Sequence, residues 1–495
     1  MSDLTVIVLA AGGGTRMKSK TMKVLHPIAG RSMVGHVLAA VAAVQPTSVV
    51  AVVGHGREQV GPHIQQLLPS VVLAVQEEQR GTADAVRVAV EAAGTTSGTV
   101  LVTYGDTPLL EGATLRAFAD DHVGSGRAMS ILSGHVADPT GYGRVVRSAD
   151  GSVEAIVEQR DASPEQAAIS EINSGIVAYD AAFLLSALPR IGNDNAKGEY
   201  YLTDTVALAR GDGLDVDAFP VEDVDQTEGA NDRFELSQLA RIKNQRILRH
   251  WMAEGVTVID PATTWIDVDV TLAPDVTVLP GVQLLGASAV AEDAVVGPDC
   301  TLKDVEIGAG AKVVRTHAEL AVIGAEAQVG PFSYLRPGAR LAPRSKVGAF
   351  VELKNAELGE GAKVPHLSYV GDAEIGEGTN IGAGTIVANY DGVAKHRTVV
   401  GRHAKTGANN TFVAPVTIGD GASTGAGAVV REDVPPGSLA LSAGKQWHLD
   451  DWVLNKRAGT ASATAAQEAL DRTDPGTGSG TGSGTGSDVG EDGSR

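Results

Sequence analysis

The chain has 495 residues, a net charge of −20 at pH 7 and a single cysteine, Cys300. Its length predicts two or three folding units. The negative charge argues against a nucleic-acid partner, because phosphate backbones are bound by an excess of Lys and Arg. One cysteine excludes an intrachain disulfide and is typical of a reducing compartment. Since no stretch approaches the roughly 20 apolar residues of a membrane helix, we expect no membrane partner and a cytoplasmic location.

Short apolar runs alternate with helix-compatible segments over residues 1–233. Continuous β-branched runs suit strands that are buried on both faces of a parallel sheet. Those runs are Val6–Leu9, Val49–Val53, Val71–Val75 and Val100–Thr103, and the helix-compatible segments include Met33–Val44 and Ala83–Ala93. The alternation predicts a Rossmann-like, doubly wound α/β domain.

A connecting helix is expected next, over residues 234–254. Apolar residues recur there at helical spacing, with Arg and Gln between them. They are Leu236, Leu239, Ala240, Ile247 and Trp251.

A six-residue repeat of aliphatic residues, often followed by Gly, runs through the next part of the chain. Six is not a helical period, and the density of Gly would destabilise a helix by about 1 kcal/mol each. The repeat predicts a β-helix over residues 255–456 in which each of these aliphatic residues points inward. The repeat is carried by Leu272, Val278, Leu284, Val290, Val296, Leu302, Ile323, Val329, Leu335, Leu341, Val347, Leu353, Leu358, Val364, Val370, Ile375, Ile381 and Val387.

Three features depart from this regular repeat. Cys300 falls on the six-residue grid, so we expect a packed small side chain rather than a nucleophile. The repeat breaks at Ala388–Thr398, where polar residues crowd together, and a loop that leaves a solenoid is often a binding element. Beyond Lys456 the chain turns to Ala, Thr, Ser and Gly, and we expect residues 457–495 to be disordered.

A glycine-rich loop follows the first predicted strand, in Leu9–Met17. It has neither the third glycine of a dinucleotide-binding loop nor the Gly-Lys-Ser/Thr of a P-loop. Arg16 closes the loop and Lys23 follows, so two cations could neutralise a triphosphate. Taken alone, the loop is weak evidence for a nucleotide site, and a plain structural turn is the alternative interpretation.

Two polar residues at other points of the domain support a nucleotide site. Asp106 ends a buried strand, and Asn231 offers a neutral oxygen at the end of the domain. Mg²⁺ prefers one or two carboxylates, other oxygen ligands and several waters, so these two residues suffice for a sparse metal site. Gln76, Gly81 and Thr82 follow another strand and could contact a base.

His366 lies in the most chemically loaded stretch of the β-helix, Pro365–Asp372. Acyl transfer to an amine needs a base, and neutral histidine is the usual choice near pH 7. Arg336 and Lys354 precede it on neighbouring coils and could bind an anionic sugar phosphate. A surface or turn histidine is the alternative interpretation.

In their order along residues 1 to about 455, these motifs resemble one bacterial family, the bifunctional N-acetylglucosamine-1-phosphate uridyltransferase/glucosamine-1-phosphate N-acetyltransferases. The resemblance implies a left-handed β-helix, a homotrimer and a cytoplasmic enzyme. It implies acetyl transfer from acetyl-CoA to glucosamine-1-phosphate, followed by uridylyl transfer from UTP with release of pyrophosphate. It rests on Leu9–Met17, Lys23–His26, Tyr104–Leu109, Gly141–Arg144, Glu171–Gly175 and the stretch around His366.

The resemblance also assigns residues to roles. His366, Arg16 and Lys23 would be catalytic, and Asp106 and Asn231 would ligate Mg²⁺. The nucleotide and sugar site would contain Leu9, Ala10, Ala11, Gly12, Lys23, Gln76, Gly81, Thr82, Tyr104, Gly105, Asp106, Gly143, Glu158, Asn173 and Asn231. The sugar phosphate of the acetyl site would be held by Arg336, Lys354, Tyr369 and Asn380, and acetyl-CoA by Ala383, Asn389, Tyr390, Ala408 and Ala426.

Two positions depart from the family pattern. Met22 stands where proline usually precedes the lysine, and Ala408 stands where serine is usual. Two other functions stay open at this point. One is a sugar-1-phosphate nucleotidyltransferase whose β-helix serves only trimerisation, and the other is a non-catalytic nucleotide-binding regulator.

Overall fold

The structure is a computed structural model that describes residues 3–95, 97–195, 198–442, 444 and 446–473. The chain divides after Leu441 into two compact units. Within the described residues, none of the helices combines the length and the apolar character that a membrane span requires.

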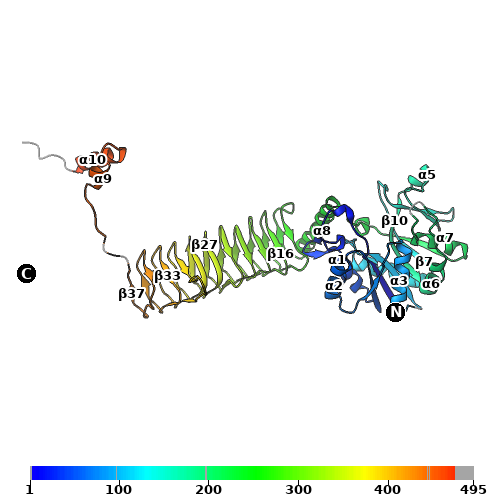
Figure 1. Ribbon diagram of the computed structural model, residues 1–495, viewed down its shortest axis with the longest axis horizontal. Helices are drawn as coiled ribbons and strands as arrows, with labels where there is room; N and C mark the ends of the chain where they lie inside the picture. The colour runs from blue at the N-terminus through cyan, green and yellow to red at the C-terminus, as the bar shows by residue number, and fades with distance from the viewer. Residues whose placement is uncertain (1–2, 96, 196–197, 443, 445, 474–495) are drawn as a thin grey trace, which may run out of the picture. The chain divides into compact units, whose positions relative to one another are not determined.

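The N-terminal part of the first unit contains a sheet with helices on both faces (Figure 1). Its main path runs in the order β11-β7-β10-β6-β1-β4-β5. The strands are β1 Leu4–Leu9, β4 Ser48–Val53, β5 Val72–Val75, β6 Thr99–Tyr104, β7 Met129–His135, β10 Glu171–Asp180 and β11 Val216–Pro220. The main helices are α1 Met33–Ala43, α2 Arg57–Leu67, α3 Thr82–Ala93, α4 Gly112–Ser125, α6 Ala181–Ala187 and α7 Thr205–Gly211. The strands and helices expected from the apolar runs are therefore confirmed to within two residues.

The sheet is mixed, which corrects the expectation of a parallel sheet. Strand β10 runs antiparallel to both β6 and β7. Between β7 and β10 the chain forms the hairpin β8 Gly143–Arg147 and β9 Val153–Val157, and no long helix intervenes. A parallel return needs a crossover, usually helical, so the chain comes back antiparallel here.

Both faces of β1 are buried, which explains its continuous apolar sequence. Val6 and Val8 pack into one core cluster, while Ile7 between them packs into another on the opposite face. This is the alternation that strand geometry imposes. The carboxyl ends of β1 and β6 consequently lie side by side, with Leu9 paired with Tyr104.

Helix α8, Arg233–Ala253, joins the sheet domain to the β-helix. Asp232 caps it by accepting hydrogen bonds from the N–H groups of Phe234 and Glu235, both at 2.9 Å. Leu239 packs in a cluster of the N-terminal domain, whereas Leu248 packs in the core of the β-helix. The helix thus contributes to both cores, which explains its apolar positions.

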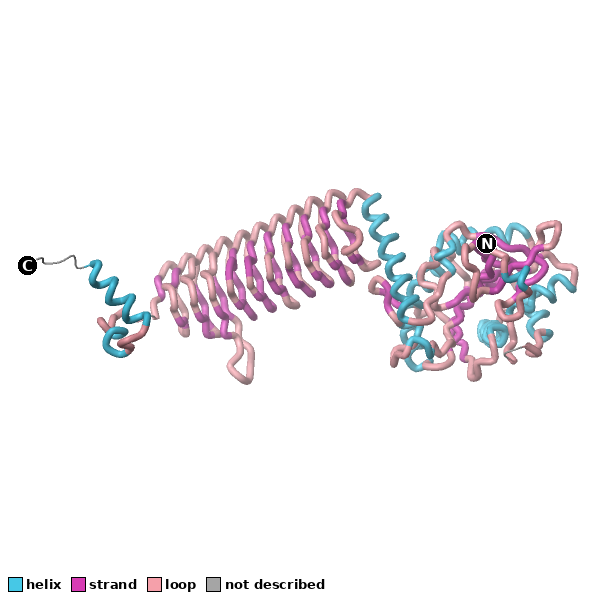
Figure 2. The backbone as a smooth tube through the Cα atoms, turned by 90° about the horizontal axis from the view of Figure 1, so that it is seen from above, coloured by secondary structure: helices cyan, strands magenta, loops and turns pink. Residues whose placement is uncertain are grey.

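The β-helix consists of short parallel strands on stacked coils (Figure 2). Thr277 pairs with Val295, 18 residues further on, so one coil contains about three hexapeptides. One face contains β12 Thr257–Val258, β15 Thr277–Val278, β18 Val295–Val296, β21 Lys312–Val313, β24 Gln328–Val329, β27 Lys346–Ala349 and β29 Lys363–His366. The other faces include β25 Ser333–Leu335, β28 Glu352–Leu358, β30 Tyr369–Ile375, β31 Ile386–Ala388, β32 Thr398–Val400, β33 Thr411–Val413 and β36 Val429–Val430.

The interior of this β-helix confirms the six-residue repeat. Every aliphatic residue assigned to the repeat is buried, and the positions stack on successive coils, as Val329, Val347 and Val364 do. Cys300 is fully buried in the same core, and burial raises the pKa of its thiol. Both findings agree with a packed small side chain.

The second unit corrects part of the expected disorder. Its described residues contain α9 Trp452–Lys456 and α10 Ala461–Thr473. Five alanines with Gln467, Glu468, Leu470 and Arg472 are strong helix formers, which accounts for α10. The expectation of disorder was therefore wrong over 461–473, and residues 474–495 lie outside the described part of the chain.

Candidate active sites

The glycine-rich loop lies at the carboxyl end of β1, as predicted. Gly14 has a φ of 58°, and a Cβ there would lie 2.5 Å from the Cβ of Lys23. Glycine is therefore needed both for the left-handed backbone and for the close approach of Lys23. Gly12 has nothing within 4 Å of such a Cβ, so the loop backbone is open to a ligand at that point.

Lys23, Asp106 and Asn231 meet in space although they are far apart in sequence. The Lys23 ammonium forms an ion pair with the Asp106 carboxylate and donates a hydrogen bond of 2.9 Å to Asn231 Oδ1. Glu235 accepts a 2.6 Å hydrogen bond from the Asn231 N–H and so holds the start of this segment. A carboxylate oxygen and an amide oxygen thus converge on one cation. That donor set also suits a hard divalent metal.

The Met22 departure leaves this arrangement intact. Met22 has φ −62° and ψ 144°, a backbone that proline also adopts. It precedes a short 3-10 turn, Lys23–Leu25, that directs Lys23 to Asp106.

Two neighbouring cavities extend from this point. One has a volume of about 530 Å³ and the other of about 610 Å³, and Arg16 and Tyr104 line both. The first also contains the predicted residues Thr82, Glu158 and Asn173. The second also contains Asp106 and Asn231. Part of the predicted nucleotide and sugar set therefore surrounds these two adjoining cavities, namely Thr82, Tyr104, Asp106, Glu158, Asn173 and Asn231. Gln76 lines another cavity, of about 560 Å³, together with Gly13 and Thr15 of the glycine-rich loop.

The three predicted amino-sugar residues lie together. Gly143 pairs with Asn173 across β8 and β10. A Cβ on Gly143 would lie 3.6 Å from Glu158 Oε1 and 3.7 Å from the Cβ of Asn173. A larger residue at 143 would fill the space between these two polar groups.

Tyr104 lies between the carboxylates of this region. Burial, followed by the charges of Asp106 and Glu158, raises the pKa of the Tyr104 phenol. A Cβ on Gly175, whose φ is 81°, would lie 2.5 Å from the Tyr104 ring. Tyr104 therefore stays a neutral hydrogen-bonding group at neutral pH, held in place by close packing.

Gln76, Gly81 and Thr82 also form one group. The Gln76 Nε2 donates to the Gly81 carbonyl at 3.1 Å and to Asp84 at 3.0 Å. Gly81 has a φ of 117°, and a Cβ there would lie 2.5 Å from the Tyr200 carbonyl oxygen. Only glycine suits that position, which sits at the N-terminus of α3.

On the β-helix, His366 and three of the predicted acetyl-CoA residues share one corner of successive coils. The His366 carbonyl accepts a hydrogen bond from the Gly384 N–H. In the same way, the Ala383 carbonyl accepts from the Asn409 N–H, and the Ala408 carbonyl accepts from the Gly427 N–H. His366, Ala383, Ala408 and Ala426 are consequently equivalent positions on consecutive coils. The Ala408 departure continues a column of small side chains beyond the exposed imidazole.

Three of the predicted sugar-phosphate residues, Arg336, Lys354 and Tyr369, lie on another face. The fourth, Asn380, pairs with Lys363 of β29 and so lies on the face that contains His366. Arg336 precedes Lys354 by one coil, since Leu335 pairs with Leu353. Arg336 Nη1 donates to Glu352 at 2.9 Å, and Lys354 Nζ lies 3.6 Å from Asp372. Among the described residues, no hydrogen bond or ion pair joins the His366 imidazole to Arg336 or Lys354. The structure therefore brings the two cations together and leaves the histidine apart within one chain.

The loop predicted at 388–398 leaves the coils between β31 and β32 (Figure 2). Asp391 accepts from the N–H groups of Val393 and Ala394, and His396 Nε2 lies 2.7 Å from its carboxylate. Asn389 donates to Asp372 from the base of the loop, and Tyr390, which pairs with Lys395 across the loop, is exposed. The predicted Asn380 is exposed. Its backbone pairs with Lys363 of β29 on one neighbouring coil and with Lys405 on the other.

Four residues were not assigned to a site from the sequence but contact the predicted ones. Lys395 interacts with Lys354, and the Asp372 carboxylate offsets part of the positive charge of Lys354. Glu235 holds Asn231, and Asp84 holds Gln76. The position of Glu235 as third residue of a capped helix was the one available signal in the sequence.

Comparisons with known proteins agree with this arrangement. Residues 6–175 match a family model described as a MobA-like NTP transferase domain. The chain is 55% identical over 469 residues to the bifunctional protein GlmU of Kineococcus radiotolerans, covering 94% of this chain and 95% of that protein. It is 54% identical over 466 residues to GlmU of Streptomyces avermitilis, with coverage of 94% and 97%. It is 56% identical over 472 residues to GlmU of Rhodococcus jostii, with coverage of 94% and 94%.

These relatives match both the sheet domain and the β-helix, and they confirm the resemblance that the sequence motifs indicate. The chain belongs to the family of bifunctional GlmU proteins.

Proposed function

We propose that the two reactions of this bifunctional family take place at two separate sites of the chain, on residues 1–233 and 255–456. The enzyme makes UDP-N-acetylglucosamine: it acetylates glucosamine-1-phosphate with acetyl-CoA and then transfers a uridylyl group from UTP to the product, releasing pyrophosphate. The observation that carries the assignment of the first site is the Lys23 ammonium held between Asp106 and Asn231, beside an open glycine loop.

In the uridylyl site, the loop and cations of the N-terminal domain hold the nucleotide. Enzymes of this family use a divalent metal, and we propose Mg²⁺ held by Asp106 and Asn231. The metal would supply positive charge to the phosphate oxygens. When UTP binds, Lys23 can turn from Asp106 to the phosphates while Arg16 approaches from the loop. Because the reaction needs no covalent enzyme intermediate, these residues act by positioning and by charge.

The sugar phosphate would lie at the other end of the same region. The space beside Gly143 is bordered by the Glu158 carboxylate and the Asn173 amide. These two groups can form hydrogen bonds with the hydroxyl and amide groups of the amino sugar. In-line attack of the sugar phosphate on the α-phosphate then requires that both substrates share the cavity system lined by Arg16 and Tyr104.

In the acetyl site, His366 would accept the proton of the sugar amine while Arg336, Lys354, Tyr369 and Asn380 hold the phosphate. The column of small residues after His366 supports a binding surface for acetyl-CoA, because alanine side chains leave room along the coil corner. A β-helix that served only trimerisation would need neither this column nor the paired cations.

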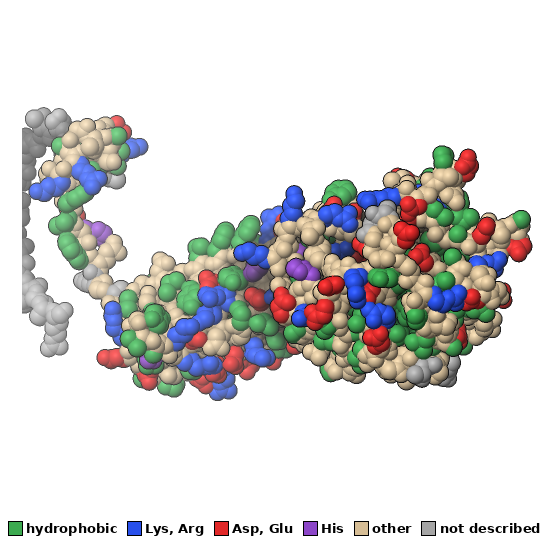
Figure 3. Space-filling model, turned by 45° about the vertical axis from the view of Figure 1, so that its right-hand side comes forward, with side chains coloured by type: hydrophobic (Ala, Val, Ile, Leu, Met, Phe, Trp, Pro, Cys, Tyr) green, Lys and Arg blue, Asp and Glu red, His purple; other side chains and the backbone are tan. Residues whose placement is uncertain are grey.

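A homotrimer is part of this proposal. Within one chain His366 and the Arg336–Lys354 pair lie on different faces, which supports a site completed by a second copy. Exposed apolar side chains on the β-helix, visible in Figure 3, also favour contact between copies. Phe332 and Phe350 are 53% and 60% exposed, and their rings stack with centroids 5.3 Å apart.

A cytoplasmic location completes the proposal. The buried Cys300 thiol has no disulfide partner, which is compatible with a reducing compartment.

One assay tests both sites. The purified protein is incubated with glucosamine-1-phosphate, acetyl-CoA, UTP and Mg²⁺, and free thiol and pyrophosphate are followed separately. Thiol release should not require UTP, and pyrophosphate release should require either acetyl-CoA or added N-acetylglucosamine-1-phosphate. Pyrophosphate without thiol would favour the nucleotidyltransferase whose β-helix is only a scaffold, and release of neither would refute the proposal.

A further inference from the structure

The orientation of the Gln76 amide is fixed by its neighbours. Gln76 is only 6% exposed, and its Nε2 lies 3.1 Å from the Gly81 carbonyl oxygen and 3.0 Å from Asp84 Oδ2. A carbonyl and an ionised carboxylate can only accept hydrogen bonds. The amide must therefore present its NH₂ group to both, and its Oε1 points away from them.

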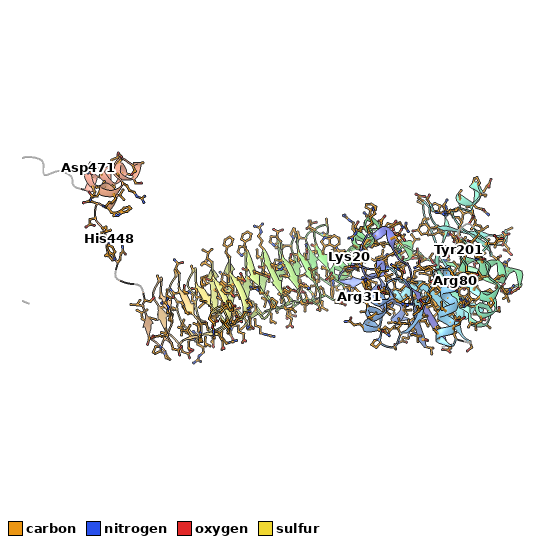
Figure 4. All side chains as sticks on the ribbon, in the orientation of Figure 1. Lys20, Arg31, Arg80, Tyr201, His448 and Asp471 are labelled. Carbon is orange, nitrogen blue, oxygen red and sulfur yellow. The ribbon has the colours of Figure 1, made fainter. Side chains whose placement is uncertain are left out.

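Asp84 is itself held as an ionised acceptor. Its side chain is 6% exposed and pairs with Arg80 at 3.0 Å and Arg87 at 2.5 Å. Burial raises the pKa of Asp84, but hydrogen bonds from Gln76, Arg87 and Arg80 outweigh this and hold the pKa below its ordinary value. Arg80, labelled in Figure 4, is 51% exposed. Asp84 also lies in the first turn of α3, where the helix dipole favours a negative charge.

We propose that Asp84 orients the Gln76 amide so that the nucleotide site selects uracil over cytosine. The inference rests on the proposed function, in which Gln76, Gly81 and Thr82 hold the uridine. Asp84 is a positioning residue: it acts through Gln76 and need not contact the base.

The selectivity follows from the edges of the two bases. Uracil carries an N–H at N3, which can donate to the Gln76 Oε1. Cytosine carries a lone pair at N3, which would face the same oxygen without a proton between them. A buried acceptor that meets another acceptor loses its hydrogen bond, and sites built on such a bond discriminate strongly. Thymine has the same N3–H as uracil, so this device does not separate those two bases.

The test replaces the fixed acceptor with one that can also donate. In Asp84→Asn the new amide can either accept from Gln76 or donate to it, so the Gly81 carbonyl is the one remaining acceptor that holds the Gln76 NH₂, and the amide turns its NH₂ towards the base more readily. The ratio of kcat/KM for UTP to that for CTP, with N-acetylglucosamine-1-phosphate as co-substrate, should fall by at least about tenfold. Substitution of a residue needed only for folding would reduce kcat/KM equally for UTP and CTP and leave this ratio unchanged.

A matched control comes from the same helix. Glu91 lies 3.2 Å from Arg87 and is 60% exposed, so Glu91→Gln makes the same acid-to-amide change without touching Gln76. The ratio should stay at the wild-type value in that variant. Acetyl transfer, which takes place on the β-helix, should be unchanged in both variants and serves as the check of folding.

A double-mutant cycle shows whether Asp84 acts through Gln76. Gln76→Ala should lower the UTP-to-CTP ratio by itself, and adding Asp84→Asn should change it no further. A wild-type ratio in either single variant, or a further fall in the double variant, would overturn the inference and leave the proposed function standing. Wild-type protein that releases no pyrophosphate from UTP would refute both. If Asp84→Asn failed to fold, the Gln76→Ala result alone would decide whether the amide selects the base.

Discussion

Lys354 and Lys395 lie side by side on the β-helix, and each changes the pKa of the other. The hydrogen bond that the Lys354 ammonium donates to the Lys395 amine, with the charge of Asp372, holds the pKa of Lys354 above its ordinary value, while the same hydrogen bond and the positive charge of Lys354 hold the pKa of Lys395 below it. Asp372 lies 3.6 Å from Lys354 and offsets only part of this positive charge. A phosphate dianion placed between the two amines would offset the charge of Lys354 and so favour the protonated form of Lys395 as well. The geometry therefore predicts a phosphate contact at Lys395 as well as at Lys354.

Replacing Lys395 by Ala should raise the KM for glucosamine-1-phosphate by about tenfold, because one charge-assisted contact to phosphate is lost. The value of kcat should change little, since the sugar amine and His366 are untouched. The measurement is thiol release from acetyl-CoA at varied sugar phosphate. Lys346→Ala is the matched control, because Lys346 is exposed on a different face of the same β-helix. An unchanged KM in the Lys395 variant would exclude the contact.

His366→Ala should reduce acetyl transfer by about 10²–10⁴-fold, the range that removal of a general base commonly gives. Uridylyl transfer from UTP to added N-acetylglucosamine-1-phosphate should continue at the wild-type rate, because the N-terminal domain is unchanged. Both rates are measured on one preparation, with the oligomeric state compared with that of the wild type by light scattering. Loss of both activities in a protein that keeps the wild-type oligomeric state would count against two separate sites.

The regular parts of the fold could be predicted from the sequence because burial imposes a period on it. Val278 and Val296 lie 18 residues apart on a six-residue grid, since each coil repeats the same inward position. The antiparallel direction of β10 could not be seen in this way. A strand buried on both faces has the same apolar sequence in either direction.

The predicted acetyl-CoA residues show where sequence spacing alone does not identify equivalent positions on successive coils. His366 and Ala383 are 17 residues apart and Ala408 and Ala426 are 18 apart, but Ala383 and Ala408 are 25 apart. The extra residues belong to the loop at 388–398, so equal sequence spacing no longer marks equal positions. The hydrogen bond between the Asn409 N–H and the Ala383 carbonyl and the pairing of Ile386 with Thr411 show the register across the loop.

The nucleotide site was predictable in its residue types and not in its contacts. Asp106 ends a strand and Lys23 follows a glycine loop, and both are visible in the sequence. Their ion pair depends on a glycine at 14 that lets Lys23 approach, and the hydrogen bond from Lys23 to Asn231 spans 208 residues. Lys395 was missed because an exposed lysine in a polar loop looks like any solvated charge.

Asp106→Ala should lower uridylyl transfer on the order of a hundredfold and shift its Mg²⁺ dependence to higher concentration, because a charged ligand is lost. Lys23 would also lose its ion-pair partner. The measurement is pyrophosphate release across a Mg²⁺ titration, with acetyl transfer as the control for folding. Asp225→Ala, which changes an acid on a neighbouring 3-10 turn, is a matched substitution that should leave the titration unchanged. An unaltered Mg²⁺ dependence in the Asp106 variant would remove that residue as a ligand.

His36 makes the stability of the N-terminal domain depend on pH. It is 4% exposed on α1, its Nε2 lies 2.8 Å from the Ile28 carbonyl oxygen, and burial lowers its pKa from 6.5 to about 4. Between these two values the unfolded chain binds a proton that the folded chain does not. The free energy of unfolding therefore falls as pH decreases from 6.5 towards 4, by about 3 kcal/mol in all if this group acts alone. Above pH 6.5 both states are neutral at His36, and no dependence on this group remains.

The comparison that isolates this effect is with His36→Gln, whose side-chain amide can still donate to the Ile28 carbonyl but does not titrate. Both proteins are equilibrated in urea at pH 7.5 and at pH 4.5 and then pulse-labelled with deuterium at one common pH. Peptides covering α1 report the unfolding of this domain apart from the β-helix. The urea midpoint should fall more steeply with acid in the wild type than in the variant. If the urea midpoints of the two proteins fell equally with acid, the pKa of His36 would be the same in the folded and unfolded states, contrary to the effect expected from its burial.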